Sequence, residues 1–203
     1  LWGCFLVEKG LVDKQLYEEA NQRFYQEYAL GKLDIHEFLN FALQPLASNE
    51  AEMLKSLHQE FMEKHIKPIM TLRGKSLIAK HRREGDHPVI ITATNSFVTG
   101  PIAQAFGVHD LIATEPEIVD GEYTGKVKGI PCFQQGKIER LHAWLNETKI
   151  EFNNSWFYSD SHNDLPLLEE VAHPIAVDPD DQLRAIASER GWQITSFRSQ
   201  HQG

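Results

Sequence analysis

The stretch Ser155–Leu168, which reads SWFYSDSHNDLPLL, places the strongest constraint on how this chain folds. Its aromatic run WFY (156–158) is bounded by small polar residues and predicts a short buried strand. Pro166 and an apolar run follow, and proline is accommodated in the first turn of a helix. The residues between strand and helix therefore form a loop at the carboxyl end of a strand, where open α/β sheets place their ligand sites.

Two acids, Asp160 and Asp164, lie on this loop. Their spacing is about one helical turn, so both carboxylates can face a single point. Paired carboxylates at such a place suit a hard divalent cation, which prefers oxygen ligands. The alternative is that Asp164 only caps the following helix and Asp160 is a solvated turn residue. This loop alone leaves both interpretations open, because short motifs have many false positives.

The chain from residue 88 onward alternates between predicted strands and predicted helices. The run PVIITA at 88–93 indicates a strand buried on both faces, as in a parallel sheet. Asp120-Gly121 separates two short extended segments, and this dipeptide is a strong hairpin signal. The alternation predicts a doubly wound, parallel, Rossmann-like α/β sheet. The predicted strands are 88–93, 110–114, 156–158, 173–177 and an edge strand at 192–197, and the predicted hairpin joins 117–119 to 123–127.

Residues 1–84 carry apolar side chains at helical spacing and predict helices throughout. Asp13, Asp34 and Asn49 stand at predicted N-cap positions, and Pro45 is expected to end a helix. The predicted helices are 13–28, 34–43, 50–65 and a further one that ends near residue 84.

The composition limits the classes of binding partner and the cellular compartment to be expected for this protein. The chain has 20 basic and 29 acidic residues, a net charge of -9, which argues against nucleic acid or an anionic membrane as a partner. The two cysteines, Cys4 and Cys132, lie far apart, which is typical of a reducing compartment, and we expect a cytoplasmic protein. No apolar run approaches the ~20 residues of a membrane span. The chain starts with Leu and shows no signal peptide, so we expect a segment upstream.

Two further residues stand at positions that suit an anion. Thr92 ends the 88–93 strand just before a helix, where its hydroxyl and nearby backbone N–H groups can hold a phosphate oxygen. Lys137 lies at the start of a predicted helix, where the macrodipole disfavours a cation unless it faces an anion. Each has a simpler interpretation, a β-branched strand residue for Thr92 and a solvated surface lysine for Lys137.

In this order the segments resemble the haloacid dehalogenase-like phosphatases, in particular the branch near phosphoserine phosphatase that has a helical cap. VIIT at 89–92 is similar to the second motif of that family, apolar residues ending in Ser or Thr. Lys137 in QGKIERL is similar to the third motif, a lone lysine. SDSHNDLPLL at 159–168 resembles the fourth motif, GDSxxDxxML, with Ser159 in place of the glycine and Leu167 in place of the methionine. The resemblance covers essentially the whole chain.

The resemblance implies an α/β core of residues 1–10 and 70–203 and a small, all-helical cap of residues 11–69. It implies a phosphoric monoester hydrolase that uses Mg²⁺ and an aspartyl-phosphate intermediate and acts on a small phosphorylated metabolite. Phosphoserine and histidinol phosphate are candidate substrates by resemblance only. Arg23 in the cap is either a contact to a substrate carboxylate or, more simply, a solvated helix arginine. We expect a monomer or a homodimer.

The resemblance also implies roles for single residues. Thr92 and Lys137 would hold phosphate oxygens. Asp160 would bind Mg²⁺, and Asp164 would be a second ligand or a residue that orients the first. Secondary substrate contacts are expected from Asn95 and Ser96.

One family feature is absent from these 203 residues. The first motif, DxDxT after a strand, carries the nucleophilic aspartate of the family and does not occur in this sequence. In the family that strand is central and lies between the strand ending at Thr92 and the strand starting at Trp156. We therefore expect those two strands not to hydrogen-bond each other, and we expect the parent protein to contain the central strand. The alternative is a non-catalytic phosphate-binding or scaffold protein that lacks the nucleophile.

Overall fold

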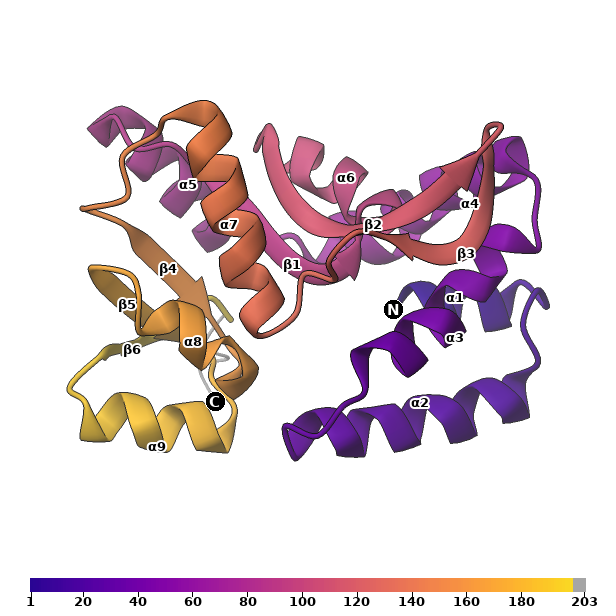
Figure 1. The fold of residues 1–203 in the computed structure, drawn as a ribbon, viewed down its shortest axis with the longest axis horizontal. Coiled ribbons are helices and arrows are strands. Elements are labelled where there is room, and N and C mark those ends of the chain that lie inside the picture. The colour runs from indigo at the N-terminus through magenta and orange to yellow at the C-terminus, as the bar shows by residue number, and fades with distance from the viewer. Residues whose placement is uncertain (199–203) are drawn as a thin grey trace.

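Helices fill the N-terminal part of the chain, and strands begin at Val89 (Figure 1). The structure is a computed structural model in which residues 1–198 are described. A π-helical turn, η1 (Met62–Ile66), and a 3₁₀ turn, η2 (Lys67–Ile69), precede the last helix of this part. The α-helices before the first strand are α1 (Trp2–Glu8), α2 (Lys14–Ala29), α3 (Ile35–Ala47), α4 (Ala51–Phe61) and α5 (Leu72–Glu84).

The second part of the chain alternates strands with helices, as the sequence predicts. The strands are β1 (Val89–Asn95), β2 (Asp110–Val119), β3 (Glu122–Lys128), β4 (Trp156–Ser159), β5 (His173–Val177) and β6 (Gln193–Thr195). The helical segments between them are α6 (Ser96–Ala105), α7 (Gln135–Thr148), the 3₁₀ turn η3 (His162–Asp164), α8 (Leu165–Leu168) and α9 (Asp181–Glu189).

Local signals set some helix ends and not others. Asp13 and Asp34 cap α2 and α3 with their side chains, as predicted. Pro45 lies inside α3, so the helix end predicted at this proline comes too early. Glu50, and not Asn49, is the N-cap of α4, because the Asn49 side chain donates to the Pro45 carbonyl at 2.8 Å instead.

Two apolar contacts attach the N-terminal helices to the rest of the chain. Around Trp2, Phe61 and Val98, the helices α1 and α4 pack against α6. Leu43 of α3 belongs to a second buried cluster, against which Tyr123 of β3 packs. Burial of large apolar side chains of this kind is the main favourable contribution to folding. The N-terminal helices are therefore attached to the rest of the chain at α6 and at β3.

The strands form two three-stranded sheets, so the predicted single doubly wound sheet is wrong in that respect. In the first sheet, β1 pairs in parallel with β2, and β3 pairs antiparallel with β2. The sequence suggested two short pieces where β2 is one long strand that passes through Pro116. Asp120 and Gly121, with φ of 52° and 86°, form the predicted hairpin turn into β3. In the second sheet, β4, β5 and β6 are parallel throughout.

β1 and β4 do not hydrogen-bond each other, which confirms the expectation for these two strands. A groove of about 560 Å³ lies between them, lined by residues 89–91 of β1 and 156–158 of β4. Ile78 of α5 and Leu141 of α7 belong to its apolar walls. We call this space the strand groove. Within residues 1–198, each of its two strand edges has backbone groups that no neighbouring strand uses.

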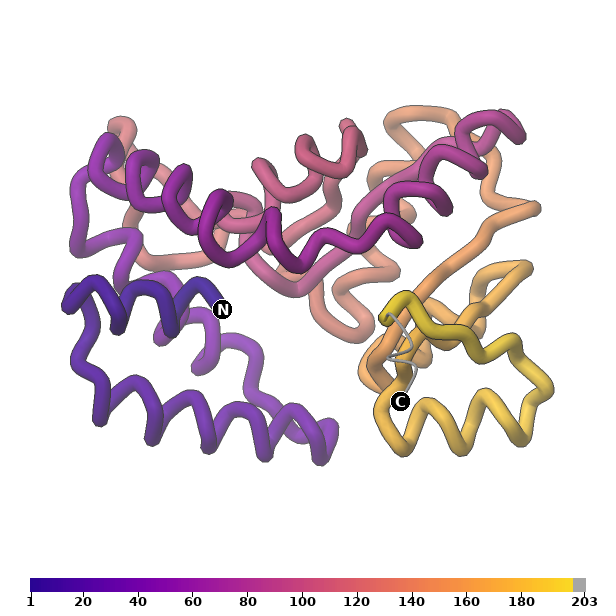
Figure 2. Tube along the Cα trace, turned by 180° about the vertical axis from the view of Figure 1, so that it is seen from behind, coloured from indigo at the N-terminus to yellow at the C-terminus, as the bar shows by residue number. Residues whose placement is uncertain are grey.

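Seen from behind, the helices α1, α2 and α3 lie on one side of the molecule and the β4-β5-β6 sheet lies on the other (Figure 2). The division into a core of residues 1–10 and 70–203 and a cap of residues 11–69 stays a prediction. In the described part of the chain, none of the helices combines the length and the hydropathy needed to cross a membrane.

We expect Leu43→Ala to lower the free energy of unfolding by about 2–5 kcal/mol, because it leaves a cavity in a fully buried apolar cluster. Urea denaturation followed by circular dichroism measures this loss. Leu16→Ala on α2, where the side chain is 67% exposed, is the control and should change stability by less than about 0.5 kcal/mol. Equal effects of the two substitutions would contradict the packing of α3 described above.

Candidate active site

A cavity of about 770 Å³ lies where β1, β4 and β5 end, beside the start of α7 and the helices α2 and α3. We call it the central cavity. Thr92 lines it from within β1, Lys137 from α7, and Asp160 and Asp164 from the segment after β4. The structure therefore brings together four side chains that come from three separate segments of the chain.

Asp160 directly follows β4 and opens into the central cavity. In the part of the chain that the structure describes, no other residue donates a hydrogen bond to its carboxylate. Burial raises the pKa of Asp160 above its usual range, and repulsion from Asp164 acts in the same direction. Solvent in the cavity reaches this side chain, yet the surrounding walls displace enough water to disfavour the charged form. A cation bound to this carboxylate would relieve that cost.

Asp164 is held by two donors from neighbouring elements. Lys137 Nζ lies 2.5 Å from one of its carboxylate oxygens, and Ser159 Oγ donates to the other at 2.7 Å. All three side chains are buried. Asp164 occupies the N-cap position of α8, but its side chain makes no capping hydrogen bond to that helix. Because both oxygens already accept hydrogen bonds, the geometry favours an orienting role over a free ligand.

A sharp turn before α7 directs Lys137 toward this carboxylate. Gln134, the N-cap residue, has φ of 45°. A Cβ at Gly136 would lie 2.1 Å from the Pro131 carbonyl oxygen, so only glycine fits there. The helix macrodipole disfavours a cation in this first turn, and the carboxylate of Asp164 offsets that cost.

Thr92 faces the cavity, whereas the two residues expected to assist it are engaged elsewhere. The Thr92 hydroxyl accepts a hydrogen bond from the backbone N–H of Thr94 in the same strand at 3.2 Å, and its proton can still be donated. Asn95 caps α6 by accepting from Val98 N at 3.1 Å, and Ser96 Oγ donates to Glu115 at 2.5 Å. The structure therefore does not bring Asn95 and Ser96 to the central cavity.

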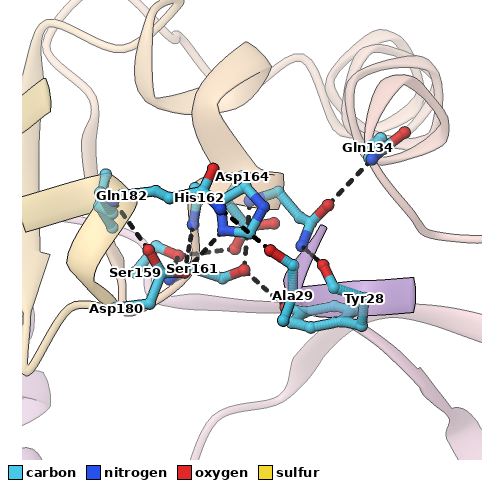
Figure 3. Close-up of polar contacts among 11 residues, drawn as sticks. Tyr28, Ala29, Gln134, Ser159, Ser161, His162, Asp164, Asp180 and Gln182 are labelled. Carbon is cyan, nitrogen blue, oxygen red and sulfur yellow. Dashed lines mark hydrogen bonds and ion pairs between the residues drawn. The ribbon is translucent and has the colours of Figure 1, made fainter. Parts of the chain in front are cut away.

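Three hydrogen bonds join the C-terminal end of α2 to the core (Figure 3). The hydroxyls of Tyr28 and Ser161 lie 2.6 Å apart, and Asn163 Nδ2 donates to the Tyr28 carbonyl at 3.1 Å. Gln182 Nε2 of α9 donates to the Ala29 carbonyl at 3.0 Å. We call these contacts the polar bridge. It uses carbonyls that a helix leaves unpaired at its C-terminus, and it joins α2 to the loop that carries the acids.

Residues outside α2 also hold the loop that carries Asp160 and Asp164. Gln134 Nε2 donates to Asn163 Oδ1 at 2.9 Å. The backbone N–H and the Nδ1 of His162 contact one Asp180 oxygen at 2.9 and 2.8 Å. Burial opposes the charge on Asp180, but hydrogen bonds from Leu183 N and from His162 lower the pKa of Asp180 below its usual range. Sequence reasoning missed these partners, and the one available signal was the position of His162 and Asn163 between two acids.

Arg23 does not line the central cavity. Its guanidinium donates to Glu37 at 2.6 Å and lies 4.0 Å from Glu27. The simpler of its two interpretations, a solvated helix arginine, agrees with this placement.

The donors around Asp160 suit Mg²⁺ better than a soft metal. Carboxylate and hydroxyl oxygens are available in the cavity from Asp160 and Thr92, and hard cations prefer such oxygen ligands. Cys132 does not line the cavity and is fully buried, and burial raises the pKa of its thiol to about 11. A protonated thiol is a poor metal ligand. The residues present therefore fit a magnesium ion at Asp160.

We expect Lys137→Met to lower the free energy of unfolding by about 3–5 kcal/mol, because it leaves the buried Asp164 carboxylate without its cation. The double variant Lys137→Met with Asp164→Leu should recover much of this loss, since no buried charge remains. Urea titrations of both single variants and the double variant give the coupling energy. Independent, additive effects would show that the two side chains do not interact.

Comparison with known proteins agrees with this geometry. The chain matches the haloacid dehalogenase-like hydrolase family over residues 1–169. A histidinol-phosphatase of Neisseria meningitidis is 42% identical over 201 residues, which are 97% of this chain and 90% of that protein. A phosphoserine phosphatase of Mycobacterium tuberculosis is 31% identical over 157 residues, which are 77% of this chain and 51% of that protein.

Solved structures show the same relationship. A protein with unknown function from Bordetella pertussis has a TM-score of 0.90 at 41% identity, covering 97% of this chain and 90% of its own. A substrate-bound phosphoserine phosphatase has a TM-score of 0.66 at 17% identity, covering 96% and 84%, and thus shares the fold. The chain belongs to the haloacid dehalogenase-like hydrolases, in the branch related to phosphoserine phosphatase.

Proposed function

We propose that this protein is a Mg²⁺-dependent phosphatase that hydrolyses the phosphate monoester of a small metabolite. One observation supports the proposal: the central cavity is lined by Asp160, whose carboxylate accepts no hydrogen bond from another residue among 1–198, and by the buried pair of Lys137 and Asp164. Phosphoryl transfer needs positioning and charge neutralisation more than covalent assistance from the protein. The cavity supplies side chains that can position a phosphate and charged groups that can neutralise it.

Each side chain has a proposed task. Asp160 would hold Mg²⁺, which takes few protein carboxylates and neutralises charge on the phosphate. Lys137 Nζ and the Thr92 hydroxyl would contact phosphate oxygens, and both line the cavity beside Asp160. Asp164 and Ser159 would hold the lysine in place, because their hydrogen bonds fix its position before substrate arrives.

The strand groove supports a proposal for the nucleophile. Thr92 lies in the carboxyl-terminal half of β1 and Asp160 follows β4, the two strands that border this groove, so a strand lying in it would end between them. An aspartate at that end would attack phosphorus, the ester P–O bond would break with its electron pair going to the ester oxygen, and that oxygen would take a proton from solvent and leave as the alcohol. Water would then hydrolyse the resulting acyl phosphate and restore the carboxylate. We therefore propose that the catalytic protein carries such a strand in the groove.

Two substrates are candidates. Histidinol phosphate is supported by the relative that is 42% identical over nearly the whole chain. Phosphoserine is supported by the relative at 31% identity, over 77% of the chain. Both are esters of a 2-aminoethanol and differ in the group on the carbon that bears the amine.

We expect Asp160→Asn, in the full-length gene product, to lower kcat for p-nitrophenyl phosphate by about 10²–10³, because it removes a charge that stabilises the transition state. Asp120→Asn at the exposed hairpin turn is the matched control and should leave kcat unchanged. Circular dichroism must show that both variants are folded.

Two outcomes would contradict this function. Full activity of Asp160→Asn would refute the role of this residue. A folded wild-type protein that binds inorganic phosphate without hydrolysing any ester would support the alternative, a phosphate-binding or scaffold protein.

A further inference from the structure

The wall of the central cavity formed by α2 and α3, together with the residues that join them, has a distinct chemistry. It consists of aromatic, aliphatic and amide side chains and, among the described residues, contains no charged one. We call it the cap wall. Its members are Asn21, Phe24, Tyr25, Tyr28, Leu33, Ile35 and Phe38. The organic part of a substrate would contact such a wall mainly through the faces of its aromatic rings.

Each cation near this wall lies beside a carboxylate. Lys137 is paired with the buried Asp164, and Arg23 is paired with Glu37 outside the cavity. Arg198 lines the cavity from the core side, where its Nε lies 4.0 Å from Asp178. The cap wall therefore provides no partner for a substrate carboxylate, and buried carboxylates need one.

Tyr25 is the side chain of the cap wall that is free to contact a ligand. It is 71% exposed although it lines the cavity, and within residues 1–198 no ring packs on it and no hydrogen bond reaches it. Phe24 and Phe38, by contrast, pack on each other with ring centroids 5.5 Å apart. Tyr28 is held by Ser161 in the polar bridge. An open tyrosine face attracts flat rings and cations, by stacking and by cation–π contact.

We infer that the cap wall selects phosphate esters of an aromatic or cationic amino alcohol that lacks a carboxylate, with Tyr25 as the ring that contacts the aromatic group. This inference rests on the phosphatase function proposed above. Tyr25 is thus a specificity-determining residue, and it has no part in the transfer of the phosphoryl group.

Three esters of 2-aminoethanol test the inference, because they differ in a single substituent on the amine-bearing carbon. The substituent is a carboxylate in phosphoserine, hydrogen in phosphoethanolamine and imidazolylmethyl in histidinol phosphate. In the full-length gene product with Mg²⁺, kcat/KM should rise in that order, with at least about a tenfold difference between the first and the last. Hydrolysis of p-nitrophenyl phosphate reports separately on the proposed phosphatase function.

The residue is tested by Tyr25→Ala. This substitution should lower kcat/KM for histidinol phosphate by about 5- to 10-fold, mainly through KM, and leave that for phosphoethanolamine unchanged, since the lost contact is to the ring. Leu16→Ala is the matched control, because it lies on the same helix, is 67% exposed and does not line the cavity. It should leave kcat/KM unchanged for both substrates.

These measurements distinguish failure of the proposed phosphatase function from failure of the inference about specificity. If p-nitrophenyl phosphate is not hydrolysed, the proposed function fails. If it is hydrolysed but phosphoserine is the best of the three esters, the inference is overturned. Loss of that preference in Arg198→Gln would then show that Arg198 binds the substrate carboxylate. If Tyr25→Ala affects all three esters equally, Tyr25 does not determine specificity.

Discussion

The buried ion pair between Lys137 and Asp164 is the interaction on which the site depends, because it links two sheets that share no backbone hydrogen bond. Lys137 belongs to α7, which packs on β1 and β2, whereas Asp164 follows β4. A buried apolar cluster that includes Ile112 and Leu167 joins the same two halves. The cluster supplies non-directional stability, and the ion pair sets the relative position of the two strand ends.

The parts of the site that could be predicted are those set by local spacing. A strand followed by Asp160 and Asp164 places both acids at a strand end, and Lys137 in a first helical turn needs an anion nearby. The sheet order could not be read in this way, because parallel strands pair over long sequence distances and both pieces of β2 looked like independent strands. Asn95 was misjudged because a helix N-cap and a ligand contact use the same side chain.

Contacts between distant segments were beyond sequence reasoning for a similar reason. Tyr28 meets Ser161 although 133 positions separate them, and Gln182 reaches Ala29 across 153 positions. Neither pair has a periodic or compositional signal, since each residue alone resembles an ordinary polar surface residue. The uncharged cap wall is also visible only in three dimensions, because charged residues such as Arg23 are interspersed in the same helix and point elsewhere.

The polar bridge has a consequence for the timing of catalysis. Each neutral hydrogen bond contributes about 0.5–1.5 kcal/mol net, so releasing the three costs on the order of 2–4 kcal/mol. A gap of that size keeps a minor state populated at about 0.1–10%. Separation of the end of α2 from the acidic loop would then be a native-state fluctuation, and motions of packed elements of this kind take microseconds to milliseconds. Turnover that is limited by release of the dephosphorylated alcohol would follow the rate of this fluctuation.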